Sequence, residues 1–275
     1  MDERDAAPAG DYVLGTDDVE VARLGLQHRV WRETMLGTWR RAGLRPGMRV
    51  VDVGAGPGFA TLDLAEIVGR DGHVTAIERS PRFVAALRRE CARRALAQVD
   101  VREADLMASE PMPGADFAWC RWVASFVSSV ETLAAWLAAT VRPGGRVVLH
   151  EYVDYGTWRW LPERPALREF VAEVMASWRA TGGEPDVASR LIGALGAAGF
   201  RPPAVRPHVF ATRPADLTWR WPASFVAVNA ARLVELGRVG PDWAHGVEAE
   251  LAAVERDPAS VMITPMVLEI VAERA

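Results

Sequence analysis

An apolar segment followed by regularly spaced glycines constrains this chain more than any other feature. Residues 50–53 predict a short buried strand, and it is followed at alternate positions by Gly54, Gly56 and Gly58. Glycine lets the backbone turn sharply and lets a ligand approach the main chain with no Cβ in the way. A helical apolar stripe and a second apolar strand come next, and Glu78 closes that strand twenty residues after the last of these glycines. This layout is typical of a nucleoside-cofactor site, in which the final carboxylate accepts the ribose hydroxyls.

The glycine spacing also indicates which kind of cofactor the turn suits. The dinucleotide fingerprint G-x-G-x-x-G, started at Gly54, would need a third glycine at position 59, where the chain has Phe59. Asp52 stands two residues before Gly54, and a carboxylate there would lie badly beside a pyrophosphate. The same carboxylate suits a cofactor that carries a cationic amino group. The spacing therefore favours a cationic nucleoside cofactor, and a nicotinamide dinucleotide stays as an alternative.

The glycine pattern and the acid before it resemble the first motif, (D/E)-x-G-x-G-x-G, of the class I S-adenosylmethionine (SAM)-dependent methyltransferases. The resemblance covers residues 46–153, and in this family an acid at the position of Asp105 typically accepts a hydrogen bond from the adenine amino group. Tyr12 and Gln27 resemble the segment that closes over the cofactor in many bacterial small-molecule methyltransferases. The resemblance implies SAM as the cofactor, bound by Tyr12, Gln27, Asp52, Gly54, Ala55, Gly56, Gly58, Glu78, Arg79, Ala104, Asp105, Leu106 and Arg121.

Strands that alternate with helices, together with the resemblance, imply one α/β domain over residues 1–275. We expect a doubly wound, mostly parallel seven-stranded sheet of the Rossmann-like methyltransferase type. A sixth strand is expected at 205–212, and a last strand at 260–272 that is antiparallel to the others. Pro222 and Pro241 are expected to break the second helical insertion. The parts of the domain are a helical lid (1–45), a cofactor-binding core (46–153) and two substrate-side insertions after strands five and six (154–183 and 213–257).

Aromatic residues gather in the segments that this fold places above one edge of the sheet. Ligands of such sheets bind beyond the carboxyl ends of the strands, near the switch in strand order. The chain has 11 tryptophans, and tryptophan gives a large rigid contact area with a polar handle. Ordinary core packing of the insertions is one interpretation. The other is an aromatic pocket for a small-molecule acceptor, lined by Trp31, Tyr152, Tyr155, Trp158 and Trp178.

Methyl transfer from a sulfonium requires little acid–base catalysis by the protein. The step is an in-line displacement, so positioning and the exclusion of water supply most of the acceleration. A base is needed only if the acceptor must lose a proton early. His150 and Glu151, at the end of the expected fifth strand, are the candidate catalytic residues, and we expect Glu151 to face the cofactor and His150 to lie in the core. The chain has no H-x-x-x-H or C-x-x-C spacing, so no metal is expected.

Composition favours a small-molecule enzyme of the cytoplasm. The formal net charge is −4, which argues against nucleic acid as the substrate, and the basic run from Arg88 to Arg94 reads as a solvated helix face. No apolar run is long enough to cross a membrane, and the acidic N-terminus does not resemble a signal peptide. Cys91 and Cys120 predict neither a disulfide framework nor a metal cluster. A monomer and a homodimer both remain open.

The sequence therefore predicts an enzyme that transfers the methyl group of SAM to a small-molecule acceptor. Oxygen is the first expectation for the acceptor atom, followed by nitrogen or carbon, and secondary metabolism is the expected setting. Three alternatives stay open. They are a SAM-binding protein of the same fold with non-methylating chemistry, an NAD(P)-dependent oxidoreductase, and a binding partner that completes another enzyme.

Overall fold

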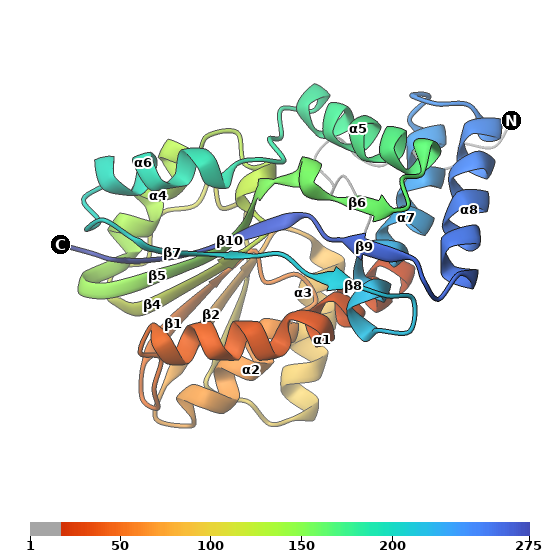
Figure 1. The fold of residues 1–275 in the computed structure, drawn as a ribbon. Helices are drawn as coiled ribbons and strands as arrows, with labels where there is room; N and C mark the ends of the chain where they lie inside the picture. Colours follow the sequence, from red (N-terminus) through yellow and green to blue (C-terminus); the bar gives the residue numbers. More distant parts are fainter. Residues whose placement is uncertain (1–17) are drawn as a thin grey trace, which may run out of the picture.

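A seven-stranded sheet runs through the centre of the protein, as the computed structural model, which describes residues 18–275, shows (Figure 1). The strand order is β3-β2-β1-β4-β5-β10-β7. β10 pairs antiparallel with β5 and β7, and the other pairings are parallel, which confirms the expected mostly parallel sheet. The bounds of these strands are β1 Arg49–Val53, β2 His73–Glu78, β3 Val99–Glu103, β4 Ala115–Arg121, β5 Val141–Asp154, β7 Ala204–His208 and β10 Met266–Glu273.

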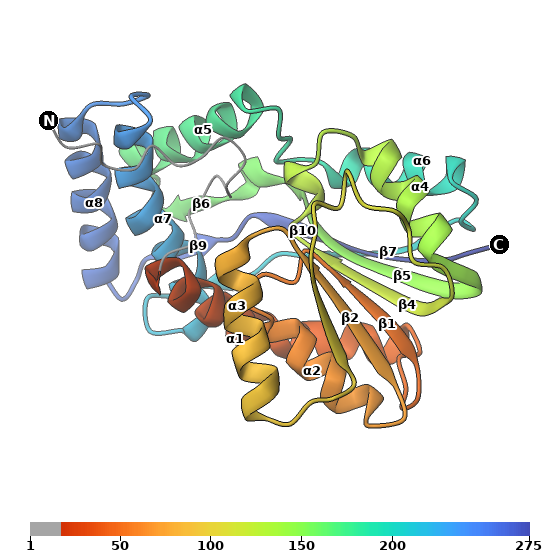
Figure 2. The ribbon, with the colours of Figure 1, turned by 180° about the vertical axis from the view of Figure 1, so that it is seen from behind.

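Helices cover both faces of this sheet (Figures 1 and 2). Val50 packs with Trp39 of α1 and Leu64 of α2, whereas its neighbour Val51 packs with Leu133 of α4 on the opposite face. A strand buried on both faces reads as a continuous apolar run, which explains the sequence signal of β1. One face carries α1 (Asp18–Arg41), α2 (Phe59–Val68) and α3 (Pro81–Arg93), and the other carries α4 (Val130–Thr140) and α6 (Ala188–Ala197).

The two insertions form a second layer beyond one end of the main sheet (Figure 1). They contribute three helices that pack on one another and the strand β6, which forms a small antiparallel sheet in the order β6-β9-β8 with two strands that flank the second insertion. Aromatic and aliphatic side chains from these elements form a separate buried cluster. The elements are η2 (Tyr155–Thr157), β6 (Arg159–Leu161), α5 (Pro165–Ala180), β8 (Ala211–Thr212), α7 (Leu217–Glu235), α8 (Pro241–Arg256) and β9 (Val261–Ile263), and η1 (Ala124–Phe126) follows β4.

Three expectations about these segments need correction. The strand expected at 205–212 is divided into β7 and β8, because the chain leaves the main sheet and joins the small one. The strand expected at 260–272 is likewise divided into β9 and β10, with Pro265, which has no backbone N–H to donate, between them. Pro222 does not break its helix: it lies inside α7 and is buried, so packing outweighs the lost hydrogen bond. The helical insertion is interrupted only before Pro241, the first residue of α8.

Candidate functional site

A cavity of about 330 Å³ opens where the carboxyl ends of β1, β2 and β4 meet the N-terminal half of α1 and the first turn of α2. Its position agrees with the rule that ligands of open α/β sheets bind outside the carboxyl ends of the strands. Most of the residues predicted to hold a cofactor border it: Gln27, Asp52, Gly54, Ala55, Gly56, Glu78, Arg79, Ala104, Asp105, Leu106 and Arg121. Tyr12 lies outside the described residues, and Gly58 is absent from the cavity wall.

The glycine turn makes the floor of this cavity. Gly54, Gly56 and Gly58 all have positive φ, at 68°, 56° and 91°, a region that side-chain-bearing residues rarely adopt. A Cβ on Gly56 would meet nothing within 4 Å, so this backbone stands open to a ligand. A Cβ on Gly58 would lie 2.1 Å from Leu87 Cδ1, because α2 and α3 pack closely there. Gly58 is therefore needed for packing, and Gly56 for access.

Asp52 is a buried carboxylate in the wall of the cavity. The hydroxyl of Thr61, in α2, donates a hydrogen bond of 2.6 Å to Asp52 Oδ2. Burial raises the pKa of Asp52 to about 6, despite that hydrogen bond and the charge of Arg121. A cationic ligand group in the cavity would restore the favourable environment that burial removes from this carboxylate.

Glu78 ends β2 and is held by two backbone groups. Its Oε2 accepts from the Gly56 N–H and its Oε1 from the Ser80 N–H, both at 2.8 Å. Burial raises the pKa of Glu78, with the two backbone hydrogen bonds acting in the opposite direction. A carboxylate offers about four acceptor positions, so this one retains capacity for the hydroxyl groups of a ligand.

The lid helix α1 contributes Gln27 to the cavity wall. Gln27 Oε1 accepts from Arg23 Nη1 and from the indole N–H of Trp221, each at 3.1 Å. These two donors fix the carboxamide, since they come from α1 itself and from α7. Gln27 thus presents a fixed polar group to the cavity, and its contact with a cofactor stays a prediction.

Arg121, the last residue of β4, brings a cation to the same cavity. Its guanidinium lies over the rings of Trp119 and Trp122, with Cζ 5.8 Å and 5.0 Å from the ring centroids. Its Nη2 is 3.4 Å from His28 Nδ1 of α1. Burial lowers the pKa of Arg121 to about 10, so the group stays charged at neutral pH.

Neither predicted catalytic residue borders the cavity. Glu151 Oε1 accepts hydrogen bonds from the backbone N–H groups of Val123 and Ala124, at 2.8 Å and 3.0 Å, and burial raises its pKa to about 7. The structure therefore differs from the expectation that Glu151 faces the cofactor. The Glu151 carboxylate instead accepts hydrogen bonds from the backbone just after β4. His150 is fully buried beside Trp119, in agreement with the expectation of a core position. A catalytic role for either residue stays a prediction.

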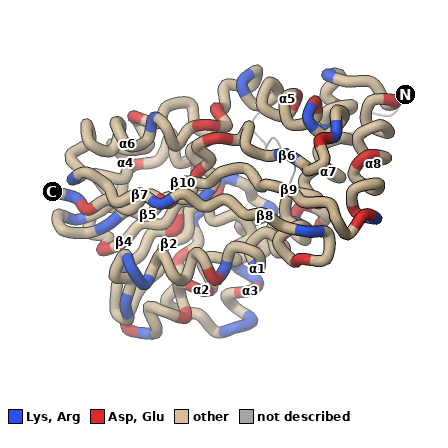
Figure 3. The backbone as a smooth tube through the Cα atoms, viewed as in Figure 1, with Lys and Arg blue, Asp and Glu red and all other residues tan. Residues whose placement is uncertain are grey.

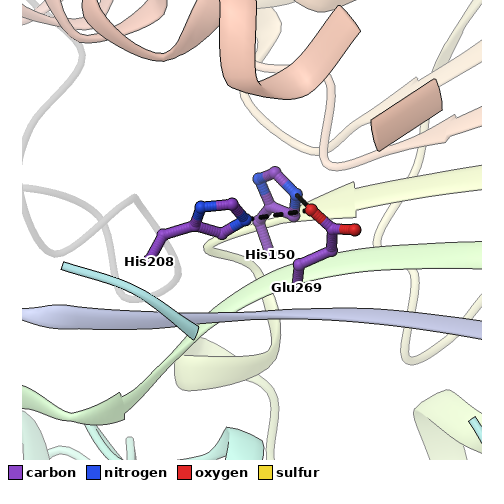
Figure 4. Close-up of side chains that lie close together, drawn as sticks. All are labelled: His150, His208 and Glu269. Atoms are coloured by element: carbon purple, nitrogen blue, oxygen red, sulfur yellow. Dashed lines mark hydrogen bonds and ion pairs between the residues drawn. The ribbon is translucent and has the colours of Figure 1, made fainter. Parts of the chain in front are cut away.

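His150 belongs to a cluster with His208 and Glu269, brought together by β5, β10 and β7 (Figure 4). One possible ligand atom from each residue lies within 4.8 Å of the others. Glu269 Oε2 is 2.9 Å from His208 Nε2 and accepts from Thr38 Oγ1 at 2.6 Å. Arg41 Nη2 donates to both Glu269 oxygens, and His150 Nε2 is 3.3 Å from Thr38 Oγ1. These hydrogen bonds occupy the Glu269 carboxylate and attach α1 to the sheet.

The predicted substrate residues are buried away from the cavity. All five belong to the aromatic cluster of the insertions, and none borders the cavity: Trp31, Tyr152, Tyr155, Trp158 and Trp178. The geometry thus agrees with the core-packing interpretation of the sequence, and a substrate contact stays a prediction. The aromatic residues of the cavity wall are instead Trp119 in β4, Trp122 and Phe126 just after it, and Phe59 and Phe83 at the starts of α2 and α3. The position of Trp119 and Trp122 at the end of the fourth predicted strand was the sequence feature that could have indicated their role in the cavity wall.

Charges of both signs are interspersed along the chain (Figure 3). On α3, Arg93 and Arg94 both pair with Glu90, and Arg94 also pairs with Glu66. This agrees with the expected solvated helix face. Within the described residues, no helix is long and apolar enough to cross a membrane.

Known proteins resemble this chain in sequence and in fold. Residues 50–145 match the family model described as "Methyltransferase domain". The chain is 34% identical over 106 residues to the protein-L-isoaspartate O-methyltransferase of Methanothrix thermoacetophila, which covers 38% of this chain and about half (48%) of that protein. It is 28% identical over 237 residues to nocamycin O-methyltransferase of Saccharothrix syringae, covering 84% of this chain and 80% of that one. The crystal structure of the [4+2]-cyclase SpnF superposes with a TM-score of 0.53 at 22% identity, over 88% of this chain and 80% of that chain, which shows a shared fold.

Proposed function

We propose that this chain, whose residues 50–145 form a class I SAM-dependent methyltransferase domain, transfers the methyl group of SAM to a small-molecule acceptor. The observation that carries the proposal is the convergence of Asp52, Glu78 and the open backbone of Gly56 on one cavity. SAM needs a carboxylate for its ammonium group, a carboxylate for its ribose and a main chain that it can approach closely. Asp52, Glu78 and Gly56 provide these three features.

The residues of the cavity fit SAM from one end to the other. In the proposed arrangement the adenine lies along residues 104–106, and Glu78 accepts the ribose hydroxyls. Asp52 faces the ammonium group, a contact that favours the charged form of this buried acid. The bound cofactor supplies a methyl group already activated by a cationic sulfur. The side chains of Trp119 and Trp122 exclude water from the side of the cavity where the acceptor approaches.

Oxygen on a small molecule is the proposed acceptor, with nitrogen or carbon as alternatives. The name of the Saccharothrix syringae relative, nocamycin O-methyltransferase, supports an oxygen acceptor and a place in secondary metabolism. A cytoplasmic location and a monomeric or homodimeric state are part of the same proposal.

The test is incubation with methyl-labelled SAM and a panel of acceptors that carry phenol, carboxylic acid, amine or acidic C–H groups. Transfer of label to one class of acceptor, with stoichiometric S-adenosylhomocysteine (SAH), supports the proposal. Tight SAH binding with no transfer to any class would favour a second candidate, a SAM-binding protein with non-methylating chemistry. The name of the structural neighbour, a [4+2]-cyclase, supports keeping that candidate.

A further inference from the structure

Arg121 is a charged group in the cavity that lacks an anionic partner. The polar atoms near its guanidinium are His28 Nδ1, at 3.4 Å from Nη2, and the Met35 sulfur, at 3.7 Å from Nη1. None of the ion pairs within 4 Å formed by the described residues includes Arg121. The carboxylates of Asp52 and Asp63 act on it only from a greater distance. A partly buried cation without a paired anion is costly, so the site favours a ligand that brings a negative charge.

The neighbours of Arg121 hold its guanidinium in place. Trp119 and Trp122 stack against it, and His28, which accepts at Nδ1, is itself fixed by a contact of 3.1 Å between its Nε2 and Asp63 Oδ2. Burial lowers the pKa of His28, so this imidazole is neutral at pH 7 and can accept from Arg121. A guanidinium held by stacking presents a planar fork of N–H donors, which matches the two oxygens of a carboxylate.

The wall of the cavity also lacks the groups that usually remove a proton from an acceptor. Among the described residues, the cavity is lined by no histidine, lysine, cysteine or tyrosine. Its three carboxylates, Asp52, Glu78 and Asp105, all lie on the β1–β3 side, which the proposed cofactor occupies. Beyond Arg121 the wall continues with Trp122, Phe126 and Val127. An acceptor whose oxygen is already deprotonated is suited to this part of the wall, because it needs no base.

We propose that Arg121 binds the carboxylate of an organic acid with an apolar body, and that this carboxylate is the methyl acceptor. This inference rests on the proposed function. One carboxylate oxygen attacks the methyl carbon, a C–O bond forms and the C–S bond breaks. The electron pair of the broken bond stays on sulfur, so SAH leaves as a neutral thioether and the acid becomes a methyl ester. No proton has to move, which is consistent with the lack of a base among the described residues on the acceptor side.

The test measures binding to the protein saturated with SAH by calorimetry. Three acids are titrated beside their neutral amides: benzoate with benzamide, cinnamate with cinnamamide, and octanoate with octanamide. At least one acid is expected to bind about tenfold or more tightly than its amide, because only the carboxylate pairs with the guanidinium. Arg121→Met removes this preference, and Arg121→Lys, which keeps the charge without the planar fork, retains part of it.

Arg29→Met is the matched control, since it removes the same charge from an exposed position on α1 and leaves the preference unchanged. Thermal unfolding and SAH affinity report whether Arg121→Met folds and keeps its cofactor site; SAH affinity is expected within about threefold of the wild type. With the preferred acid as substrate, label from SAM appears as a methyl ester that mild alkali releases as methanol.

Three outcomes would overturn the inference alone. They are equal binding of every acid and its amide, an acid preference that survives in Arg121→Met, and a loss of SAH affinity in Arg121→Met as large as in Asp52→Ala. The last would assign Arg121 to the carboxylate of the cofactor. Failure of SAH to bind the wild-type protein would instead overturn the proposed function, and the inference with it.

Discussion

The carboxylate of Glu78 accepts a hydrogen bond of 2.8 Å from the backbone N–H of Gly56, so the end of β2 is joined directly to the glycine turn after β1. The two strands are parallel neighbours in the sheet. A ligand that contacts the turn therefore also contacts this carboxylate. Because the hydrogen bond fixes Glu78 before a ligand arrives, little conformational entropy is lost on binding.

Removing either cavity carboxylate should weaken cofactor binding. We expect Glu78→Ala and Asp52→Ala each to cost about 1–3 kcal/mol of SAH binding free energy, because polar or charged ligand groups lose their partners. Calorimetry with SAH measures the effect. Glu66→Ala, on the exposed side of α2, is the control and should bind as the wild type does. Wild-type affinity in both cavity variants would contradict this placement of the site.

Two glycines of the turn should respond differently to the same substitution. Gly56→Ala puts a methyl group into open cavity space, so we expect a large loss of SAH affinity and a stability cost of only about 1–2 kcal/mol from the positive φ. Gly58→Ala drives its Cβ to 2.1 Å from Leu87 Cδ1 and should lower the free energy of unfolding more. Urea unfolding and SAH titration of both variants separate the effects. The reverse order of stabilities would show that the packing at Gly58 is misassigned.

The affinity for SAH should fall in mild acid. Burial raises the pKa of Asp52 to about 6, and a ligand ammonium binds the deprotonated carboxylate better than the protonated one. Affinity is then full above pH 7 and decreases as the pH falls through 6. The pKa of Glu78 is also raised, so it adds a change of the same sign. Titrations between pH 5 and 8 should show a flatter profile for Asp52→Asn than for the wild type, and identical profiles would exclude Asp52 as the titrating group.

The His208–Glu269 contact should stabilise the fold above acidic pH. The pKa of Glu269 is lowered to about 2, because the hydrogen bonds from His208, Thr38 and Arg41 outweigh the effect of its burial. A carboxylate with a depressed folded-state pKa contributes stability above its unfolded pKa, and loses it as the pH falls toward the folded value. Glu269→Gln should therefore lower the free energy of unfolding by about 1–3 kcal/mol at pH 7, and flatten its decline between pH 5 and 2.

Urea unfolding across that pH range provides the measurement. Glu273→Gln is the control, since Glu273 on the same strand pairs with Arg146 and Arg201 at a more exposed position and should contribute less. Equal losses of unfolding free energy in Glu269→Gln and Glu273→Gln would show that the buried cluster stabilises the fold no more than an exposed ion pair does. Because no metal is expected, a chelator should leave the melting temperatures of the Glu269→Gln and Glu273→Gln variants unchanged.

Glu151 offers a test between a structural and a catalytic role. Its substitution leaves the N–H groups of Val123 and Ala124 without their acceptor, so Glu151→Ala should lower the free energy of unfolding by about 1–3 kcal/mol. Val123 also borders the cavity, so SAH affinity should decrease as well. A catalytic role predicts the opposite pattern, with stability and SAH affinity preserved and only the rate of methyl transfer lost.

The cofactor side of the site was predictable because its signals are local. Asp52, Gly54 and Gly56 belong to one strand-to-helix turn, and Glu78 ends the next strand, so their spacing alone brings them to one cavity. The parallel sheet followed from the same alternation. The division of the last strands did not, because an apolar pattern continues unchanged across the point where the chain passes from one sheet to the other.

The rest of the site depends on contacts between distant segments. The cluster of His150, His208 and Glu269 exists only because β10 inserts between β5 and β7, which no spacing in the sequence encodes. Aromatic composition predicts buried surface but not whether it faces a ligand, so Trp158 and Trp178 lie in the core of the insertions. Trp122 borders the cavity instead, at the end of a core strand.

The most direct test of the account is calorimetric titration of the purified protein with SAH, with NADH and NADPH titrated in parallel. The account predicts that SAH binds with a dissociation constant in the micromolar range and that neither nicotinamide cofactor binds. Binding of a nicotinamide cofactor alone would contradict it, and would make the cavity beside Asp52 and Glu78 the site of an oxidoreductase.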